Sequence, residues 1–241
     1  TIVDVNADGY PDIYLARTGL QKSKGPQPER KNELFVKQKN GTFKEEAGRY
    51  GLDSDRATNH ANFFDYDGDG DLDCYLLNIP TNFSTVNKVR AQQTKDGIKR
   101  ITTPAHEYES DQLLRNDGTH FTDVTMAAGL YNYGFSLSSL VHDFNGDGWQ
   151  DIYIANDYID ADKLYINQGN GAFTDEAPNY FRHSSLHSMG SDLAELNGDG
   201  LPDLVSVDML AGDLVRHKSL ENGMRANRYN SLIRLGYGHQ M

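Results

Sequence analysis

The sequence predicts an all-β protein built from repeated four-stranded antiparallel sheets, the architecture of a β-propeller. Three observations predict it: an acidic, glycine-containing loop occurs four times, a β-type run follows each loop, and a second strand-turn-strand pattern recurs between the loops. A four-stranded meander that recurs about every 60 residues is typical of propeller blades. We expect three complete blades and about half of a fourth.

The acidic loop has its fullest form in residues 65–73, which read DYDGDGDLD, and its other copies span residues 4–12, 143–151 and 195–203. Each copy has an oxygen-bearing side chain at positions 1, 3, 5 and 9 and a glycine at position 6. Because Ca²⁺ takes about six to eight oxygen ligands at roughly 2.3–2.6 Å, a loop wound around the ion presents carboxylates or amides at alternate residues. Glycine permits the sharp turn. The loops therefore predict up to four calcium sites.

The predicted ligands are the side chains at positions 1, 3, 5 and 9 and the backbone carbonyl at position 7. They are Asp4, Asn6, Asp8, Tyr10 and Asp12; Asp65, Asp67, Asp69, Asp71 and Asp73; Asp143, Asn145, Asp147, Trp149 and Asp151; and Glu195, Asn197, Asp199, Leu201 and Asp203. The alternative is an acidic turn that binds no metal. A helix-loop-helix calcium site is excluded, because it needs a glutamate at position 12, where this chain has Leu15, Leu76, Ile154 and Ser206.

The strands can be placed around these loops. Apolar runs precede the loops and β-type runs follow them, so each loop is predicted to be the tip of a hairpin. A second hairpin pattern begins at Asn32, Asp111 and Asp162. From the first residue of a loop to the leucine of the following hairpin the spacing is 30, 48 and 21 residues, whereas the step from that leucine to the next loop is nearly constant. The length variation therefore lies between the second and third strands of each blade.

Variable loops on a rigid scaffold often carry recognition, and these loops are expected on the face opposite the calcium loops. The largest insert, at about residues 80–110, contains both basic and aromatic side chains. They are Lys88, Arg90, Lys95, Lys99 and Arg100 with Phe83, His106 and Tyr108. Such a patch fits an anionic glycan or an acidic protein, and a solvated surface loop is the alternative.

Composition narrows the partners and the location. The net charge of −12 argues against nucleic acid and anionic membranes, although four bound Ca²⁺ ions would bring it to −4. The one cysteine, Cys74, is expected to be a buried core residue. The chain has no apolar stretch long enough to span a membrane, no signal peptide and no initiator methionine, so we expect a piece of a longer exported protein. Loops of the modest affinity typical of extracellular modules would be filled outside the cell.

The fourth repeat is expected to be incomplete. No second hairpin follows residues 204–207, and residues 213–235 favour one or two helical turns. An arc of three and a half blades would leave exposed strand edges, which proteins avoid. We therefore expect either further blades outside this sequence or pairing of the edges with another copy.

The loops, together with the hairpin pattern that follows them, resemble the FG-GAP or VCBS repeats of integrin α-subunit propellers and many bacterial surface proteins. Residues 187–210, with 228–230 and 236–240, are similar to bacterial relatives of cartilage acidic protein that carry ASPIC/UnbV domains. The resemblance covers residues 1–241. It implies one propeller domain that is part of a seven-bladed propeller, an extracellular or cell-surface location, and binding instead of catalysis. Glu195 departs from the usual Asp, so we expect the fourth calcium site to be the weakest or to be coordinated differently.

No catalytic motif stands out in the sequence. His106-Glu107 begins a zinc-protease-like pattern, but Ser110 stands where the second histidine is needed, and His183 and His187 are interpreted as structural. The leading hypothesis is a calcium-rigidified extracellular module that binds a protein or a glycan. The alternatives are a lectin-like or polysaccharide-cleaving domain and a purely architectural segment of a larger exported protein.

Overall fold

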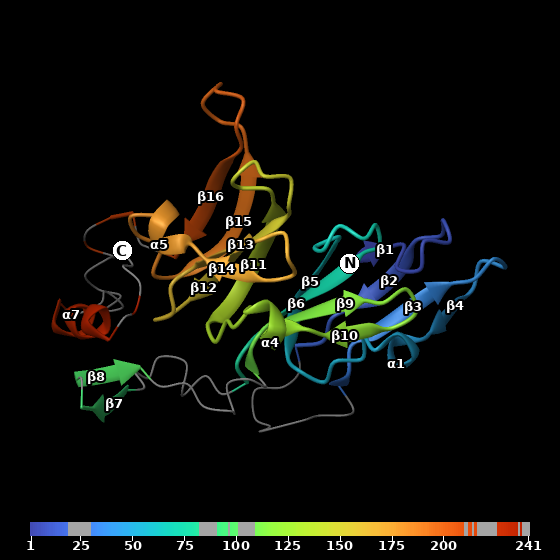
Figure 1. Ribbon diagram of the computed structural model, residues 1–241, viewed down its shortest axis with the longest axis horizontal. Coiled ribbons are helices and arrows are strands. Elements are labelled where there is room, and N and C mark those ends of the chain that lie inside the picture. Colours follow the sequence, from blue (N-terminus) through green and yellow to red (C-terminus); the bar gives the residue numbers. More distant parts are fainter. Residues whose placement is uncertain are drawn as a thin grey trace.

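The chain folds into a row of antiparallel sheets that follow one another in sequence order (Figure 1). The computed structural model describes residues 1–18, 30–81, 91–95, 97–100, 109–209, 212–213, 215, 226–235 and 237. Within them lie three four-stranded sheets and one two-stranded sheet that continue the repeat, and a separate small hairpin. The predicted all-β fold of four-stranded blades is confirmed.

The strands of each sheet follow the chain, so that every sheet is a meander of strands A to D. The first sheet contains β1 (Ile2–Val3), β2 (Asp12–Leu15), β3 (Glu33–Lys37) and β4 (Phe43–Glu45). The second contains β5 (Thr58–Phe64), β6 (Asp73–Asn78), β9 (Gln112–Asn116) and β10 (Phe121–Asp123). The third contains β11 (Phe135–His142), β12 (Asp151–Asp157), β13 (Lys163–Asn167) and β14 (Phe173–Asp175). The fourth contains β15 (Ser188–Ala194) and β16 (Asp203–Asp208).

Alternating side chains of each strand B fill the spaces between neighbouring sheets. In β6, Cys74 and Leu76 belong to the core shared with the first sheet, whereas Tyr75 and Leu77 belong to the core shared with the third. All four are fully buried. Because successive side chains of a strand point to opposite faces, a strand between two sheets has apolar side chains on both faces. Burial also raises the pKa of Cys74 well above its usual value, so this thiol is a core residue, as predicted.

A single helical turn follows strand D in each complete sheet, and the sequence interpretation did not anticipate it. These turns are α1 (Ala47–Tyr50), α4 (Thr125–Ala128) and α5 (Ala177–Tyr180). The first two end at Gly51 and Gly129, both in the left-handed conformation. A Cβ at Gly51 would lie 2.7 Å from the backbone oxygen of Phe121, so no side chain fits there. This packing explains the recurring glycine-leucine pair at these positions.

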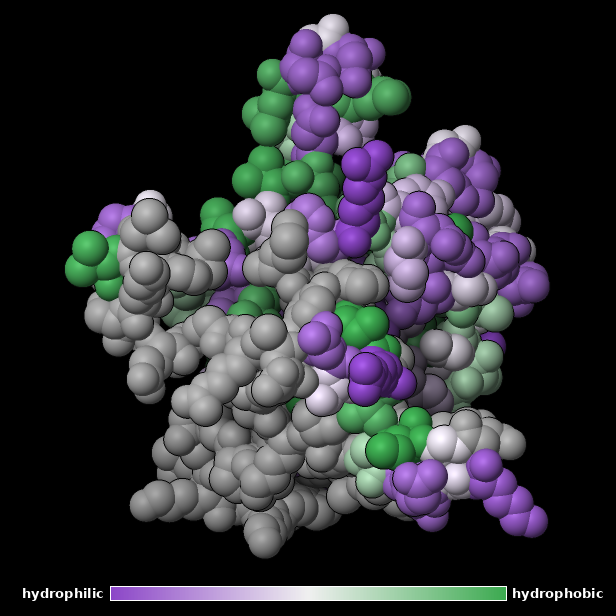
Figure 2. Space-filling view, turned by 90° about the vertical axis from the view of Figure 1, so that its left-hand side faces the viewer, coloured by the Kyte–Doolittle hydropathy of each residue, from purple (hydrophilic) through white to green (hydrophobic). Residues whose placement is uncertain are grey.

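The two ends of the row present apolar side chains to solvent. Ile13 and Leu15 of the first sheet are 40% and 44% exposed, although their register equivalents in the second and third sheets are buried. Val205 and Val207 of β16 are 38% and 55% exposed, and their equivalents are also buried. Figure 2 shows the β15–β16 hairpin projecting at the top of the molecule, with hydrophobic surface continuing below its tip.

The remaining elements lie outside the repeat. Within the large insert the structure describes the hairpin of β7 (Ala91–Thr94) and β8 (Gly97–Arg100). Most of the predicted basic and aromatic patch, including Phe83, Lys88, Arg90, His106 and Tyr108, lies outside the described residues. Near the end of the chain, α7 (Ala226–Arg234) contributes Leu232 to a small core with Ile159 and Tyr237. The helical turns expected there are present.

Candidate metal centre

The four acidic loops each connect strand A to strand B, at the same end of every sheet. The side chain at position 1 winds the loop by accepting hydrogen bonds from backbone N–H groups further along. Asp65 accepts from Gly68 at 2.7 Å and from Gly70 at 3.0 Å. In the third loop Asp143 accepts from the glycines at the same two positions, whereas in the first loop Asp4 accepts from the N–H groups of Asp8 and Gly9. The side chain at position 1 therefore holds the backbone of these loops in its wound conformation.

Position 4 of the loop adopts a left-handed backbone conformation, as position 6 does. Glycine occupies position 4 in three loops, but Ala7 takes this conformation in the first, with φ of 54°. The sequence pattern did not assign a role to position 4. At Gly68 the conformation is supported by a neighbouring blade, because a Cβ there would lie 3.0 Å from the ring of Trp149. The second and third loops are therefore in contact through the side chain of Trp149, at position 7 of the third loop.

The carboxylate at position 9 has a structural role that the sequence interpretation missed. One oxygen of Asp73 accepts the N–H of Tyr66 within the loop at 3.0 Å, and the other accepts the N–H of Asn116 at the end of strand C at 2.8 Å. Asp12 and Asp151 make the same pair of bonds. All three aspartates are fully buried. Position 9 thus ties the loop to the second hairpin of its own blade.

Burial makes the ionised form of these three aspartates unfavourable unless a positive charge lies nearby. Burial raises the pKa of Asp73 to about 7, although its two backbone hydrogen bonds act in the opposite direction. Burial also raises the pKa of Asp12 and of Asp151. A cation near these groups would favour their ionised form, which is the form that binds metal.

In the second loop the carboxylates converge. One oxygen from each of Asp65, Asp67 and Asp73 lies within 4.8 Å of the others, the only such group among the described residues. Two oxygens bound to one Ca²⁺ at roughly 2.3–2.6 Å are at most about 5 Å apart. The spacing of the three carboxylates therefore fits a single calcium ion.

Two further observations in this loop support a cation. Asp67 and Asp71 each have a buried carboxylate oxygen, Oδ1, with no hydrogen-bond partner. Burial and the nearby charge of Asp69 raise the pKa of both groups. Buried acceptors are nearly always satisfied, so two unpaired oxygens in one loop indicate a ligand. The residues present fit a hard divalent cation.

The first and third loops differ because asparagine stands at position 3. The amide nitrogen of Asn6 donates to Asp8 at 3.2 Å, and that of Asn145 donates to Asp147 at 2.8 Å. The second loop has Asp67 at position 3, which cannot donate in this way, and buried oxygens of Asp67 and Asp71 are left without a partner there. The first and third loops keep the predicted ligands together without forming a triad of acids.

The hydrogen bonds of the fourth loop depart further, and this is the loop with a glutamate at position 1. Glu195 accepts hydrogen bonds from the backbone N–H groups of Asn197 and Gly198. In the other three loops position 1 also binds the N–H of the glycine at position 6, but no bond joins Gly200 to Glu195 in the described structure. Asp203 is only partly buried and has no strand C partner there.

The residues at position 7 are placed similarly in all four loops. The backbone N–H groups of Tyr10, Asp71, Trp149 and Leu201 donate to the carboxylate at position 5, at 2.8–3.0 Å. These bonds hold the side chains of Asp8, Asp69, Asp147 and Asp199 toward the loop interior. That the carbonyl of position 7 binds metal stays a prediction.

A second set of polar residues recurs at the opposite end of the blades. A buried tyrosine of strand B contacts the residue that precedes strand C. Tyr75 donates to Asp111 at 3.1 Å and Tyr153 to Asp162 at 2.8 Å, while Asn32 donates to Tyr14 at 2.9 Å. A hydroxyl from strand A of the next sheet completes each group. The signal was present in the sequence, because Asn32, Asp111 and Asp162 all stand two residues before the hairpin leucine.

The two histidines that stand four residues apart do not act together. Nδ1 of His187 lies 2.7 Å from Asp157, whose hydrogen bond is the main reason why the pKa of His187 is raised. His183 instead lines a separate pocket.

Comparison with known proteins agrees with the repeat. No curated protein matches the sequence closely enough to count as a relative. The longest helix in the described part of the chain has nine residues, and none there could cross a bilayer. Residues 4–76 and 143–206 match the family model described as FG-GAP-like repeat. The matched segments make up more than half of the sequence, so the chain belongs to the FG-GAP-like repeat family, whose repeats are propeller blades.

Proposed function

We propose that this protein is an extracellular, calcium-stabilised β-propeller module that binds a protein or a glycan. The main support for calcium binding is the geometry of the second loop, where three carboxylates converge and two buried oxygens lack partners. Calcium would be held by Asp65, Asp67, Asp69, Asp73 and the carbonyl of Asp71, and by the matching residues of the other loops.

The ion would have a structural role. When bound, it supplies positive charge at a loop whose carboxylates otherwise repel one another. Asp73 would then link the ion to the loop and to strand C, because it already accepts hydrogen bonds from both. Calcium binding in the loop would therefore stabilise the whole blade.

The extracellular location and the binding role are supported by the family. FG-GAP repeats commonly occur in extracellular proteins and suggest an adhesion-type module. The proposed role is binding without catalysis. The ligand is proposed on the face opposite the calcium loops, where the connections between strands B and C differ most in length.

Calcium is expected to raise the melting temperature. One site at a calcium concentration of 100 times its Kd adds about 2.7 kcal/mol, which for a chain of this size corresponds to about 5–10 °C. Differential scanning calorimetry with EDTA, and then with about 10 mM calcium, measures the shift; this concentration saturates a site with a Kd of about 10⁻⁴ M.

Asp67→Ala separates metal binding from ordinary stability. Because Oδ1 of Asp67 has no protein partner, the variant should melt near wild type in EDTA and gain less from calcium. Asp117→Ala, which removes a carboxylate from a nearby turn, is the control and should keep the full calcium response. A melting curve that calcium leaves unchanged in the wild type would contradict the proposal.

We also propose that the open ends of the row bind a second copy of the chain, head to tail. Ile13 and Leu15 are exposed on the first sheet, at positions that in the second and third sheets pack against the preceding sheet. Val205 and Val207 are exposed on the fourth sheet, at positions that elsewhere pack against the following sheet. The two faces therefore match in the way that neighbouring sheets do within the chain.

Sedimentation should show association that grows with protein concentration. Ile13→Lys and Val207→Lys should each prevent chain growth, because a charge would be buried in the contact. A mixture of the two variants should form a one-to-one dimer, because Ile13→Lys keeps the face of the fourth sheet intact and Val207→Lys keeps the face of the first sheet intact. Met126→Lys, on the exposed side of α4, is the control. A wild-type protein that stays monomeric at about 100 µM would contradict this proposal, because association through matched faces is typically stronger than that.

A further inference from the structure

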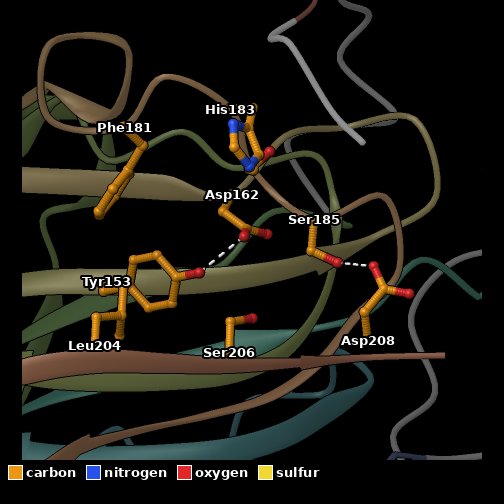
Figure 3. Close-up of a pocket in the computed structure, with 9 residues that line it drawn as sticks. Tyr153, Asp162, Phe181, His183, Ser185, Leu204, Ser206 and Asp208 are labelled. Atoms are coloured by element: carbon orange, nitrogen blue, oxygen red, sulfur yellow. Dashed lines mark hydrogen bonds between the residues drawn. The ribbon is translucent and has the colours of Figure 1, made fainter. Parts of the chain in front are cut away.

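A pocket of about 360 Å³ lies between the third and fourth sheets and extends along β16 from Leu204 to Asp208, at the end of the strand far from the calcium loop. Figure 3 shows side chains from three segments converging on it: Tyr153 of β12, Phe181 and His183 from the connection before β15, and Leu204 and Ser206 of β16. One wall is therefore apolar, and the rest carries hydroxyl, imidazole and carboxylate groups. This mixture in a volume above about 300 Å³ is typical of small-molecule sites.

The pocket exists because the fourth repeat departs from the others at Ser206. By strand register, Ser206 corresponds to Leu76 in the second sheet and to Ile154 in the third. Both of those side chains are fully buried between sheets, whereas Ser206 is exposed. A small hydroxyl residue has replaced the large apolar side chain that closes this space elsewhere.

Asp208 is a second departure at the same place. It corresponds to Asn78 and Asn156, whose amide groups donate to backbone carbonyls of their own blades at 2.9 Å. An aspartate cannot donate. Oδ2 of Asp208 accepts hydrogen bonds from the hydroxyl of Ser185 and from the N–H of His187.

Two oxygens at the pocket have no partner. Oδ1 of Asp208 and Oγ of Ser184 are both buried from solvent and unpaired. Leaving such buried groups unsatisfied destabilises the protein, so a ligand that supplies hydrogen-bond donors would bind favourably. A bare metal ion fits poorly, because no single ligand atom from each of Asp162, His183 and Asp208 lies within 4.8 Å of the other two.

We propose that this pocket binds one sugar residue of a glycan. The hydroxyls of a pyranose ring can donate to Asp208 and exchange hydrogen bonds with Ser184 and Ser206, while its C–H face lies against Phe181 and Leu204. Asp162 does not take part directly, since its oxygens already accept from Asn156, Tyr153 and Ser188. This inference rests on the proposed binding role and gives it a site and a ligand class.

The test is saturation-transfer NMR with the methyl glycosides of common hexoses and N-acetylhexosamines, after a glycan array has ranked them. Wild-type protein should show transfer to at least one glycoside. Ser206→Ile, which introduces the side chain found in the third sheet, should weaken binding at least tenfold by filling the pocket. Asp208→Asn should also weaken binding at least tenfold, because it removes the unpaired carboxylate.

Both substitutions restore residues that this fold already uses at equivalent positions, so their melting temperatures should stay near wild type. Met126→Thr, on the exposed side of α4 and away from the pocket, is the control and should bind like wild type. Absence of transfer from every glycoside, a Ser206→Ile variant that binds normally, or binding only of Zn²⁺ or Ca²⁺ at the pocket would overturn the inference.

The sugar-binding test and the calcium test can fail independently of each other. A blank glycan test with an intact calcium-dependent melting shift removes only the sugar site. Sugar binding that depends on Ser206 in a protein whose melting ignores calcium removes only the metal role.

Discussion

Asp73→Ala is expected to lower the free energy of unfolding by about 3 kcal/mol, because two buried backbone N–H groups would lose their acceptor. The carboxylate of Asp73 is fully buried and binds the N–H of Tyr66 in the loop and of Asn116 in strand C. Urea denaturation in EDTA measures this loss without any contribution from metal.

Asp203→Ala is the matched control for this effect. It stands at position 9 of the fourth loop, where it accepts the N–H of Leu196 but is only partly buried and has no described strand C partner. We expect a loss of about 1 kcal/mol or less there. Equal losses in the two variants would show that position 9 does not connect the hairpins of a blade.

Asp111→Ala is expected to cost about 3–4 kcal/mol, because it removes the centre of a buried network. The carboxylate accepts four hydrogen bonds at 2.7–3.1 Å, from Tyr75, Asn78, Asn132 and Ser136. These donors come from both the second and the third sheet, so the loss should reduce the cohesion between two blades. Urea denaturation of the variant and the wild type, with their m-values compared, measures the loss in the free energy of unfolding.

Asp111→Asn tests the same network through its pH dependence. Asn32 occupies the equivalent position in the first sheet, so an amide fits there and the cost should be nearer 1 kcal/mol. Burial raises the pKa of Asp111 to about 7, above its value in the unfolded chain of about 3.9. The folded state therefore favours the protonated form, and this contribution is complete below pH about 4 and is lost as the pH rises through about 7. In the variant the free energy of unfolding should change less with pH over this range. A pH dependence equal to that of the wild type would contradict the raised pKa of Asp111.

The fold was predictable because its signals are local and repeated. The loop pattern fixes where strands A and B meet, and the hairpin pattern fixes strands C and D, so the four-stranded sheets follow from the sequence. The single helical turns were missed because four residues such as Ala47–Tyr50 are too short to show helical periodicity. The glycines that end two of them were visible, but their close packing against the next blade is a tertiary contact.

The metal loops were predictable at the level of residue type and less so at the level of geometry. The sequence treats Asn6 and Asp67 as equivalent ligands at position 3. In the structure Asn6 pairs with Asp8, whereas Asp67 retains an unpaired oxygen. The role of position 9 in binding strand C depends on residues that are distant along the chain, such as Asp73 and Asn116. Such contacts follow from sheet pairing and cannot be read from a nine-residue pattern.

The most direct test of the account is calcium stoichiometry, measured by equilibrium dialysis at millimolar free calcium. We expect at least one bound ion, held by the second loop, and up to four in total. Asp67→Ala should bind one ion fewer than the wild type, and Asp117→Ala should bind the same number. A wild-type protein that binds no calcium under these conditions would contradict the central claim that the acidic loops are metal sites.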